Sequence, residues 1–164
     1  MSSPLTAVAA SHVVDIPAMR QAVAAILPGD QQISAKALAG LTEQLRAHIE
    51  GLAPHVENAA AELPREDVPR YCALACVGEA RSKLRAHPGQ GPGRDEAYAR
   101  KLARSLAALC DHYITLTGQA MCVACDREIR SADDAVPYDQ ISNAGRAVTG
   151  RVHSDCLNTP RPRR

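Results

Sequence analysis

Hydrophobic residues recur at steps of three and four over most of the chain between residues 15 and 117. The longest series follows Ser34, and two shorter ones follow Asp67 and Asp95. This spacing predicts amphipathic helices, each of which buries one face. The expected buried positions are Leu38, Leu41, Leu45, Ile49, Leu52 and Val56 in the first of these series, Ala73, Val77, Ala80 and Leu84 in the second, and Leu102, Leu106, Leu109, Tyr113 and Leu116 in the third.

Residues that favour helix ends flank these series. Asp15, Ser34 and Asp67 are expected N-caps, because their side chains can accept a bond from the first free backbone N–H groups. Gly118 suits a C-terminal cap. Pro54 lies inside the longest series and cannot donate to the carbonyl of Glu50, so a kink or break is expected there.

The pattern predicts a mainly α protein with a bundle of about four helices at residues 15–117. After Gly118 the helical period fades and turn residues become frequent, which predicts a small C-terminal module at residues 118–157 that needs a metal to hold it together. Residues 1–14 are expected to form a flexible N-terminus. Residues 158–164, which contain three arginines among prolines, are expected to form a disordered basic tail.

Four residues of the module have the spacing of metal ligands. Cys122 and Cys125 are separated by two residues, and after 27 intervening residues His153 and Cys156 are again separated by two. Three cysteines and one histidine are a donor set that zinc prefers, and a set of four protein ligands indicates a structural ion. The alternatives are a redox pair, which would need a βαβ context that is absent, and unrelated structural thiols.

Residues 120–157 resemble a treble-clef or LIM-like zinc knuckle, with a short β-hairpin expected between the two ligand pairs. The sequence departs from the commoner form of that motif after the second cysteine, where Asp126 replaces the usual glycine. The departure bears on the geometry of the turn and leaves the set of four ligands unchanged.

The remaining cysteines, Cys72, Cys76 and Cys110, lie on expected helices. Free cysteine is among the most buried residue types, so we expect them to act as small core hydrophobes. A second metal site that combines them with His112 is the alternative.

Composition and charge limit the function classes. The net charge is +1, which provides no field for nucleic acid or anionic lipid. The module has one aromatic residue for base stacking, Tyr138, so a zinc-containing DNA-binding regulator remains only an alternative. No apolar run reaches the ~18 residues of a membrane span. The N-terminus lacks the positive charge of a signal peptide, and we therefore expect a cytoplasmic protein.

No sequence motif of a known catalytic site is present. Phosphate loops, dinucleotide fingerprints and nucleophile elbows are all missing, and no histidine is part of a Glu-x-x-His pair. His48 and His55 share a helix face and are expected at the surface or its rim. The sequence favours a non-catalytic role, with an enzyme of natural product biosynthesis as an alternative if distant residues form a site.

Three segments, PRYCALACVGEARSKL (69–84), SLAALCDHYITLTG (105–118) and MCVACDREI (121–129), are similar to a family of small actinobacterial (Streptomyces-type) proteins. These proteins are often labelled natural product biosynthesis proteins. The resemblance spans about residues 35–157 and implies a cytosolic accessory or regulatory role. We therefore expect an accessory or interaction protein whose partner is another protein.

Overall fold

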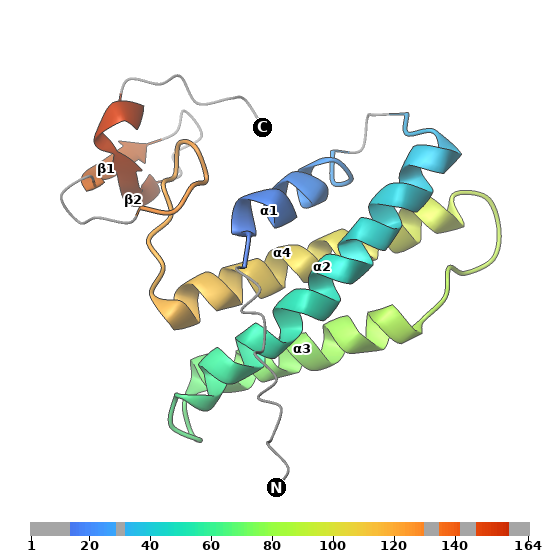
Figure 1. Ribbon diagram of the computed structural model, residues 1–164, viewed down its shortest axis with the longest axis horizontal. Coiled ribbons are helices and arrows are strands. Elements are labelled where there is room, and N and C mark those ends of the chain that lie inside the picture. The colour runs from blue at the N-terminus through green and yellow to red at the C-terminus, as the bar shows by residue number, and fades with distance from the viewer. Residues whose placement is uncertain (1–13, 29–31, 130–134, 142–146, 158–164) are drawn as a thin grey trace, which may run out of the picture.

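The computed structural model describes residues 14–28, 32–129, 135–141 and 147–157 (Figure 1). Within these ranges the chain forms four helices and one β-hairpin. The helices are α1 (Ile16–Ala24), α2 (Ala35–Ala61), α3 (Val68–Arg85) and α4 (Arg94–Thr117). The strands β1 (Ala135–Ile141) and β2 (Ala147–His153) are followed by the single-turn 3₁₀ helix η2 (Ser154–Cys156). The predicted fold class is therefore confirmed. The expected basic tail and all but the last residue of the expected flexible N-terminus lie outside the described ranges.

Helices α2, α3 and α4 pack because each buries most of the stripe that the sequence predicts. Helix α2 packs along α4, α3 lies against both, and α1 covers α4 and part of α2 (Figure 1). One apolar cluster runs through all four helices. Of the predicted positions, Leu38, Leu41, Leu84, Tyr113 and Leu116 are only partly buried, and the others are buried.

The helix ends match the sequence prediction in three places and differ in one. The Asp15 carboxylate accepts a bond from the N–H of Ala18 at 3.0 Å, and the Ser34 hydroxyl accepts one from Ala37 at 3.3 Å. Gly118 ends α4 in the left-handed conformation, at φ 64°. Asp67 lies at the N-cap position of α3, but its side chain makes no capping bond.

Of the kink or break expected at Pro54, the break is wrong, because α2 continues across the proline. Pro54 lies on the exposed side of the helix, where water can solvate the carbonyl that loses its partner. The neighbouring Leu52, Ala53 and Val56 are almost fully buried. Their burial stabilises the continuous helix by several times the cost of one hydrogen bond.

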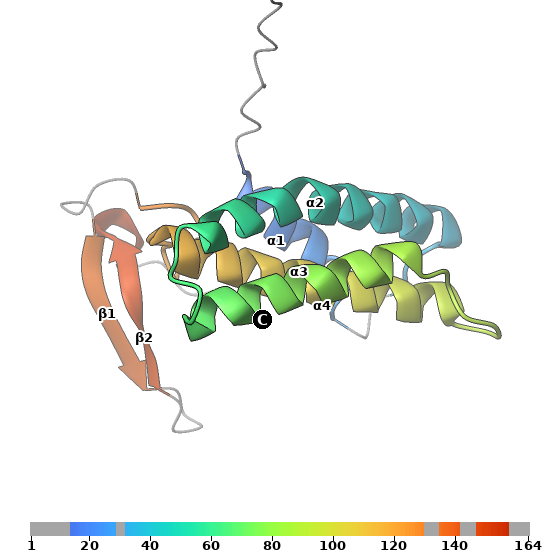
Figure 2. The ribbon, with the colours of Figure 1, turned by 90° about the horizontal axis from the view of Figure 1, so that it is seen from below.

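The β-hairpin stands at the end of the helices where α4 finishes (Figure 2). Strands β1 and β2 pair antiparallel from Ala135 opposite His153 to Ile141 opposite Ala147. We call residues 120–129 the knuckle, and the knuckle together with β1, β2 and η2 the C-terminal module. Its own apolar cluster has three buried members among the described residues, Cys122, Ile129 and Val152. Within the described ranges, every helix is too short or too polar to cross a lipid bilayer.

Candidate metal centre

The structure brings the four predicted ligand residues together. One side-chain ligand atom from each of Cys122, Cys125, His153 and Cys156 lies within 4.8 Å of every other. Cys122 is buried and the other three are half-buried. This is the only such group of four among the described residues. The arrangement can hold one metal ion with a ligand from each of four chain positions.

The first ligand pair lies on a tight turn made by backbone hydrogen bonds. The N–H of Ile129 donates to the carbonyl of Ala120 at 2.7 Å, and the N–H of Cys122 donates to Arg127 at 2.8 Å. Inside this small ladder the N–H of Asp126 returns to the carbonyl of Cys122 at 2.9 Å. Asp126 adopts φ 56°, the left-handed region that glycine enters most easily. Aspartate tolerates this region better than most residues, so the turn forms without glycine.

The second ligand pair is placed by β2. His153 is the last residue of the strand, and Cys156 ends the helical turn that follows. The knuckle lies alongside β2, because the N–H of Val123 donates to the carbonyl of Arg151 at 3.0 Å. The approach needs a glycine in the strand: a Cβ atom on Gly150 would lie 2.5 Å from Cγ1 of Val123. Gly150 therefore lets the two ligand pairs meet.

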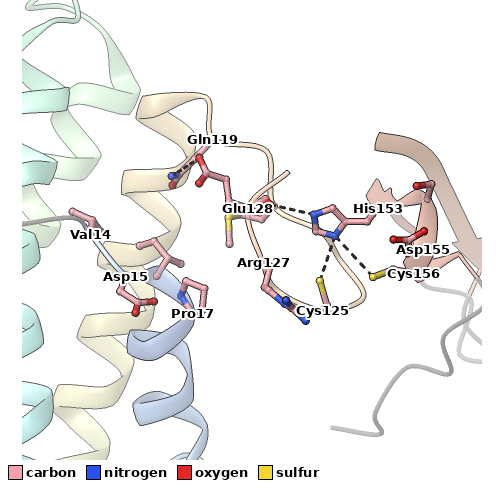
Figure 3. Close-up of a pocket in the computed structure, with 13 residues that line it drawn as sticks. Val14, Asp15, Pro17, Gln119, Cys125, Arg127, Glu128, His153, Asp155 and Cys156 are labelled. Atoms are coloured by element: carbon pink, nitrogen blue, oxygen red, sulfur yellow. Dashed lines mark hydrogen bonds between the residues drawn. The ribbon is translucent and has the colours of Figure 1, made fainter. Parts of the chain in front are cut away.

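The His153 ring is held in one orientation (Figure 3). Its Nε2 lies 3.1 Å from the backbone carbonyl of Glu128, which can only accept a hydrogen bond, so Nε2 carries the proton. Nδ1 faces the sulfurs of Cys125 at 3.4 Å and Cys156 at 3.9 Å. Metal-binding histidines usually donate their second ring N–H to such a carbonyl, which fixes the tautomer and directs the free lone pair at the ion. His153 is therefore oriented as an Nδ1 ligand.

The sulfurs do not ionise equally. Burial opposes ionisation of Cys122, but the backbone N–H groups of His153, Cys125 and Ala124 direct hydrogen bonds at its sulfur and lower its pKa to about 6. The pKa of Cys156 is raised to about 11 by burial, by hydrogen bonds with the other two thiols and by their negative charge. Three neighbouring thiolates repel one another unless a cation lies between them.

Among the described residues, two polar side-chain contacts connect the C-terminal module to the helices and to the segment that follows α4. The guanidinium of Arg20, on α1, lies 3.2 Å from the carboxylate of Asp126 and 3.2 Å from that of Asp111, on α4. Beyond the end of α4, Nε2 of Gln119 donates to the Glu128 carboxylate at 3.0 Å. The supporting roles of Arg20, Gln119 and Glu128 were not predicted from the sequence. The sequence signal for Arg20 was the acid at position 126, because a charged residue in place of the usual glycine indicates an ionic partner.

The remaining cysteines differ from one another. Cys110 is fully buried in the helical core, where burial raises its pKa to about 12. Cys76 is half-buried, and burial also raises its pKa. Cys72 is exposed, so its expected role as a core residue is wrong. It is adjacent to the buried stripe of α3 and not part of it. These residues and His112 do not form a second metal-ligand cluster in the described part of the chain.

The two helix histidines singled out from the sequence are both half-buried. The His55 ring contacts that of Tyr113 edge-on, with centroids 6.4 Å apart. His48 keeps its Nε2 atom buried without a hydrogen-bond partner among the described residues. Neither belongs to a cluster of metal-ligating residues.

Comparison with known proteins gives a family match for the helices but none for the candidate metal centre. Residues 17–118 match a family of unknown function, and the match ends just after α4, before the first ligand. No curated protein and no solved structure matches the chain. Because the matched residues make up more than half of the chain, it belongs to the family of unknown function DUF6415.

Proposed function

We propose that Cys122, Cys125, His153 and Cys156 bind one structural Zn²⁺ ion. The observation that carries the proposal is the His153 ring, whose Nε2–H is taken by the Glu128 carbonyl while Nδ1 points at two cysteine sulfurs. Three sulfurs and one nitrogen are the donors that zinc prefers over magnesium or calcium. The order of knuckle, hairpin and short helical turn supports a treble-clef-like arrangement around the ion.

The bound ion would cross-link the four chain positions that hold it and would not take part in catalysis. Four protein ligands fill a tetrahedral zinc ion, which leaves no position for water or substrate. Few of the described apolar residues of the module are fully buried, so the ion would stabilise a small surface that packing alone does not maintain. A fixed surface without a reactive group suits docking, and we infer a non-catalytic accessory or protein-interaction role in the cytoplasm. The link to specialised metabolism rests on the family resemblance of the three sequence segments.

Elemental analysis tests the metal. Full-length protein purified without chelator should contain about one zinc per chain, and Cys156→Ser should lose most of it because it removes one thiolate ligand. Cys72→Ser is the matched control, since it replaces an exposed cysteine outside the cluster. Zinc-free wild-type protein, or equal zinc in both variants, contradicts the assignment.

Affinity capture tests the interaction role. The full-length chain, Cys156→Ser and a chain that ends at residue 118 are each used as bait in an extract of the native host. We expect specific partners with the full-length chain alone, and light scattering should give the same oligomeric state for all three. Partners that the shortened chain retains would instead assign the docking surface to the helices.

A further inference from the structure

A cleft of about 820 Å³ separates the start of α1 from the metal centre. Figure 3 shows Val14, Asp15 and Pro17 on one side of it, while His153 and Cys156 lie on the other. Its lining combines apolar side chains near α1 with the outer face of the predicted zinc site. Clefts with an apolar wall and a few polar groups are typical of binding sites.

The charges that line the cleft are mostly negative. Asp15, Glu128 and Asp155 contribute three carboxylates, whereas Arg127 is the only lysine or arginine in the lining. A zinc ion with three thiolates adds a further net charge of about −1. The cleft therefore attracts a cation, although the net charge of the whole chain is +1.

One polar atom in the lining lacks a partner. Nε2 of Gln119 donates to the Glu128 carboxylate at 3.0 Å, and this bond fixes the amide, because the flipped amide would place two acceptor oxygens together. The other end of the amide, Oε1, is buried and accepts no hydrogen bond from the described residues. Water cannot reach this oxygen, so Gln119 contributes to the cleft through the bond that holds the Glu128 carboxylate in place.

We propose that the cleft binds a segment of a partner protein that places a lysine or arginine beside an apolar residue. The cationic N–H groups pair with the carboxylates, and the methylene stem and the apolar neighbour lie against Val14 and Met121. The inference deepens the proposed function and rests on it, since the zinc ion fixes one wall of the cleft.

The experiment follows backbone amide NMR shifts of zinc-loaded full-length protein during titration with N-acetyl-Leu-Arg-amide. We expect saturable shifts confined to residues 14–16, 119–121, 127–128 and 153–156. N-acetyl-Leu-Glu-amide, which reverses the charge, should leave these signals unchanged. Absence of saturable shifts, or equal shifts with the acidic peptide, overturns the proposal. Equal shifts with spermidine also overturn it, because they would indicate a small polyamine instead of a protein segment.

Two substitutions of opposite sign sharpen the test. Glu128→Gln keeps the bond to Gln119 and removes a negative charge, so the Leu-Arg peptide should bind about five-fold more weakly. Arg127→Gln removes the competing cation and should strengthen binding by a similar factor of about five. Asp95→Asn, at the far end of α4, is the control and should change nothing. Equal affinities in all three variants contradict the proposal.

Zinc content is measured on every NMR sample. A zinc-loaded chain that does not respond to the Leu-Arg peptide overturns the cleft proposal alone. A chain that takes up no zinc overturns the proposed function and the cleft proposal with it.

Discussion

The helices and the C-terminal module are stabilised by different means. Among the described residues, the cluster within the helices has 21 buried members, whereas that of the module has three. A core of the first size can offset the conformational entropy of ordering the chain, but one of the second size cannot. We therefore infer that the helices are stable through packing whereas the module depends on a bound metal ion, and the two should respond to different perturbations.

Metal removal should produce the largest difference. Structural zinc contributes on the order of 10 kcal/mol to the folding of small zinc modules, and the helices do not need it. After chelation we expect the NMR signals of residues 120–129 and 135–157 to collapse toward random-coil positions, while most of the helical circular dichroism remains. If the helical signal is lost as well, the two parts form one cooperative unit.

A core substitution should give the reverse result. Leu106 is fully buried in α4, so Leu106→Ala should lower the free energy of unfolding of the helices by about 2 to 5 kcal/mol. Zinc affinity, measured by competition with a chelator, should change little. Leu74→Ala is the control, because Leu74 is 38% exposed. A Leu106→Ala protein with intact helices but weakened zinc binding would reverse the comparison.

Gly150→Ala should damage the module without removing a ligand. The new methyl group would lie 2.5 Å from Val123 Cγ1, and forcing the two apart costs about 1 to 3 kcal/mol. We expect weaker zinc binding and unchanged thermal unfolding of the helices. The double variant Val123→Ala, Gly150→Ala restores the space and should recover most of the affinity. Failure of this rescue would show that Gly150 acts through something other than space.

The smallest expected effect is a pH dependence confined to the helices. Burial raises the pKa of Cys110 from 9.0 to about 12, so the folded state keeps this proton at a pH where the unfolded chain releases it. The stability from this group is complete below pH 9 and is lost as the pH rises from about 9 toward 12. Between pH 8 and pH 10 it should decline by about 1.4 kcal/mol.

Chemical denaturation at both pH values tests this, with Cys110→Ala as reference. The variant has no thiol at this position. Between pH 8 and pH 10 its free energy of unfolding should therefore fall by about 1.4 kcal/mol less than that of the wild type. Equal declines in the two proteins would mean that other groups cause the whole effect.

The features that the sequence predicted are those determined by near neighbours. The buried stripes, the caps at Asp15 and Ser34 and the ligand spacing of Cys122 and Cys125 all depend on residues within a few positions. The wrong expectations came from residue type without position. Proline usually ends a helix, but Pro54 faces solvent between buried neighbours and the helix continues. Cys72 is exposed because it lies one residue outside the α3 stripe.

Contacts between distant residues could not be predicted in this way. The Glu128 carbonyl contacts His153, which lies 25 positions later in the sequence. Val123 lies close to Gly150, which is 27 positions later. Which pairs meet depends on the register of the hairpin and on the path of the chain into it. Spacing could therefore predict which four residues form the cluster, but it could not supply the groups that orient them.

The position of Arg20 between Asp111 and Asp126 has a consequence for sequence covariation within the family. The family match includes Arg20 and Asp111 but ends before Asp126. We expect relatives that continue into a knuckle to keep a cation at position 20 whenever an acid stands at position 126. Relatives that end after the fourth helix are released from that constraint. Among relatives that continue into a knuckle, the residue at position 20 should thus covary with the residue at position 126, more than a hundred positions later.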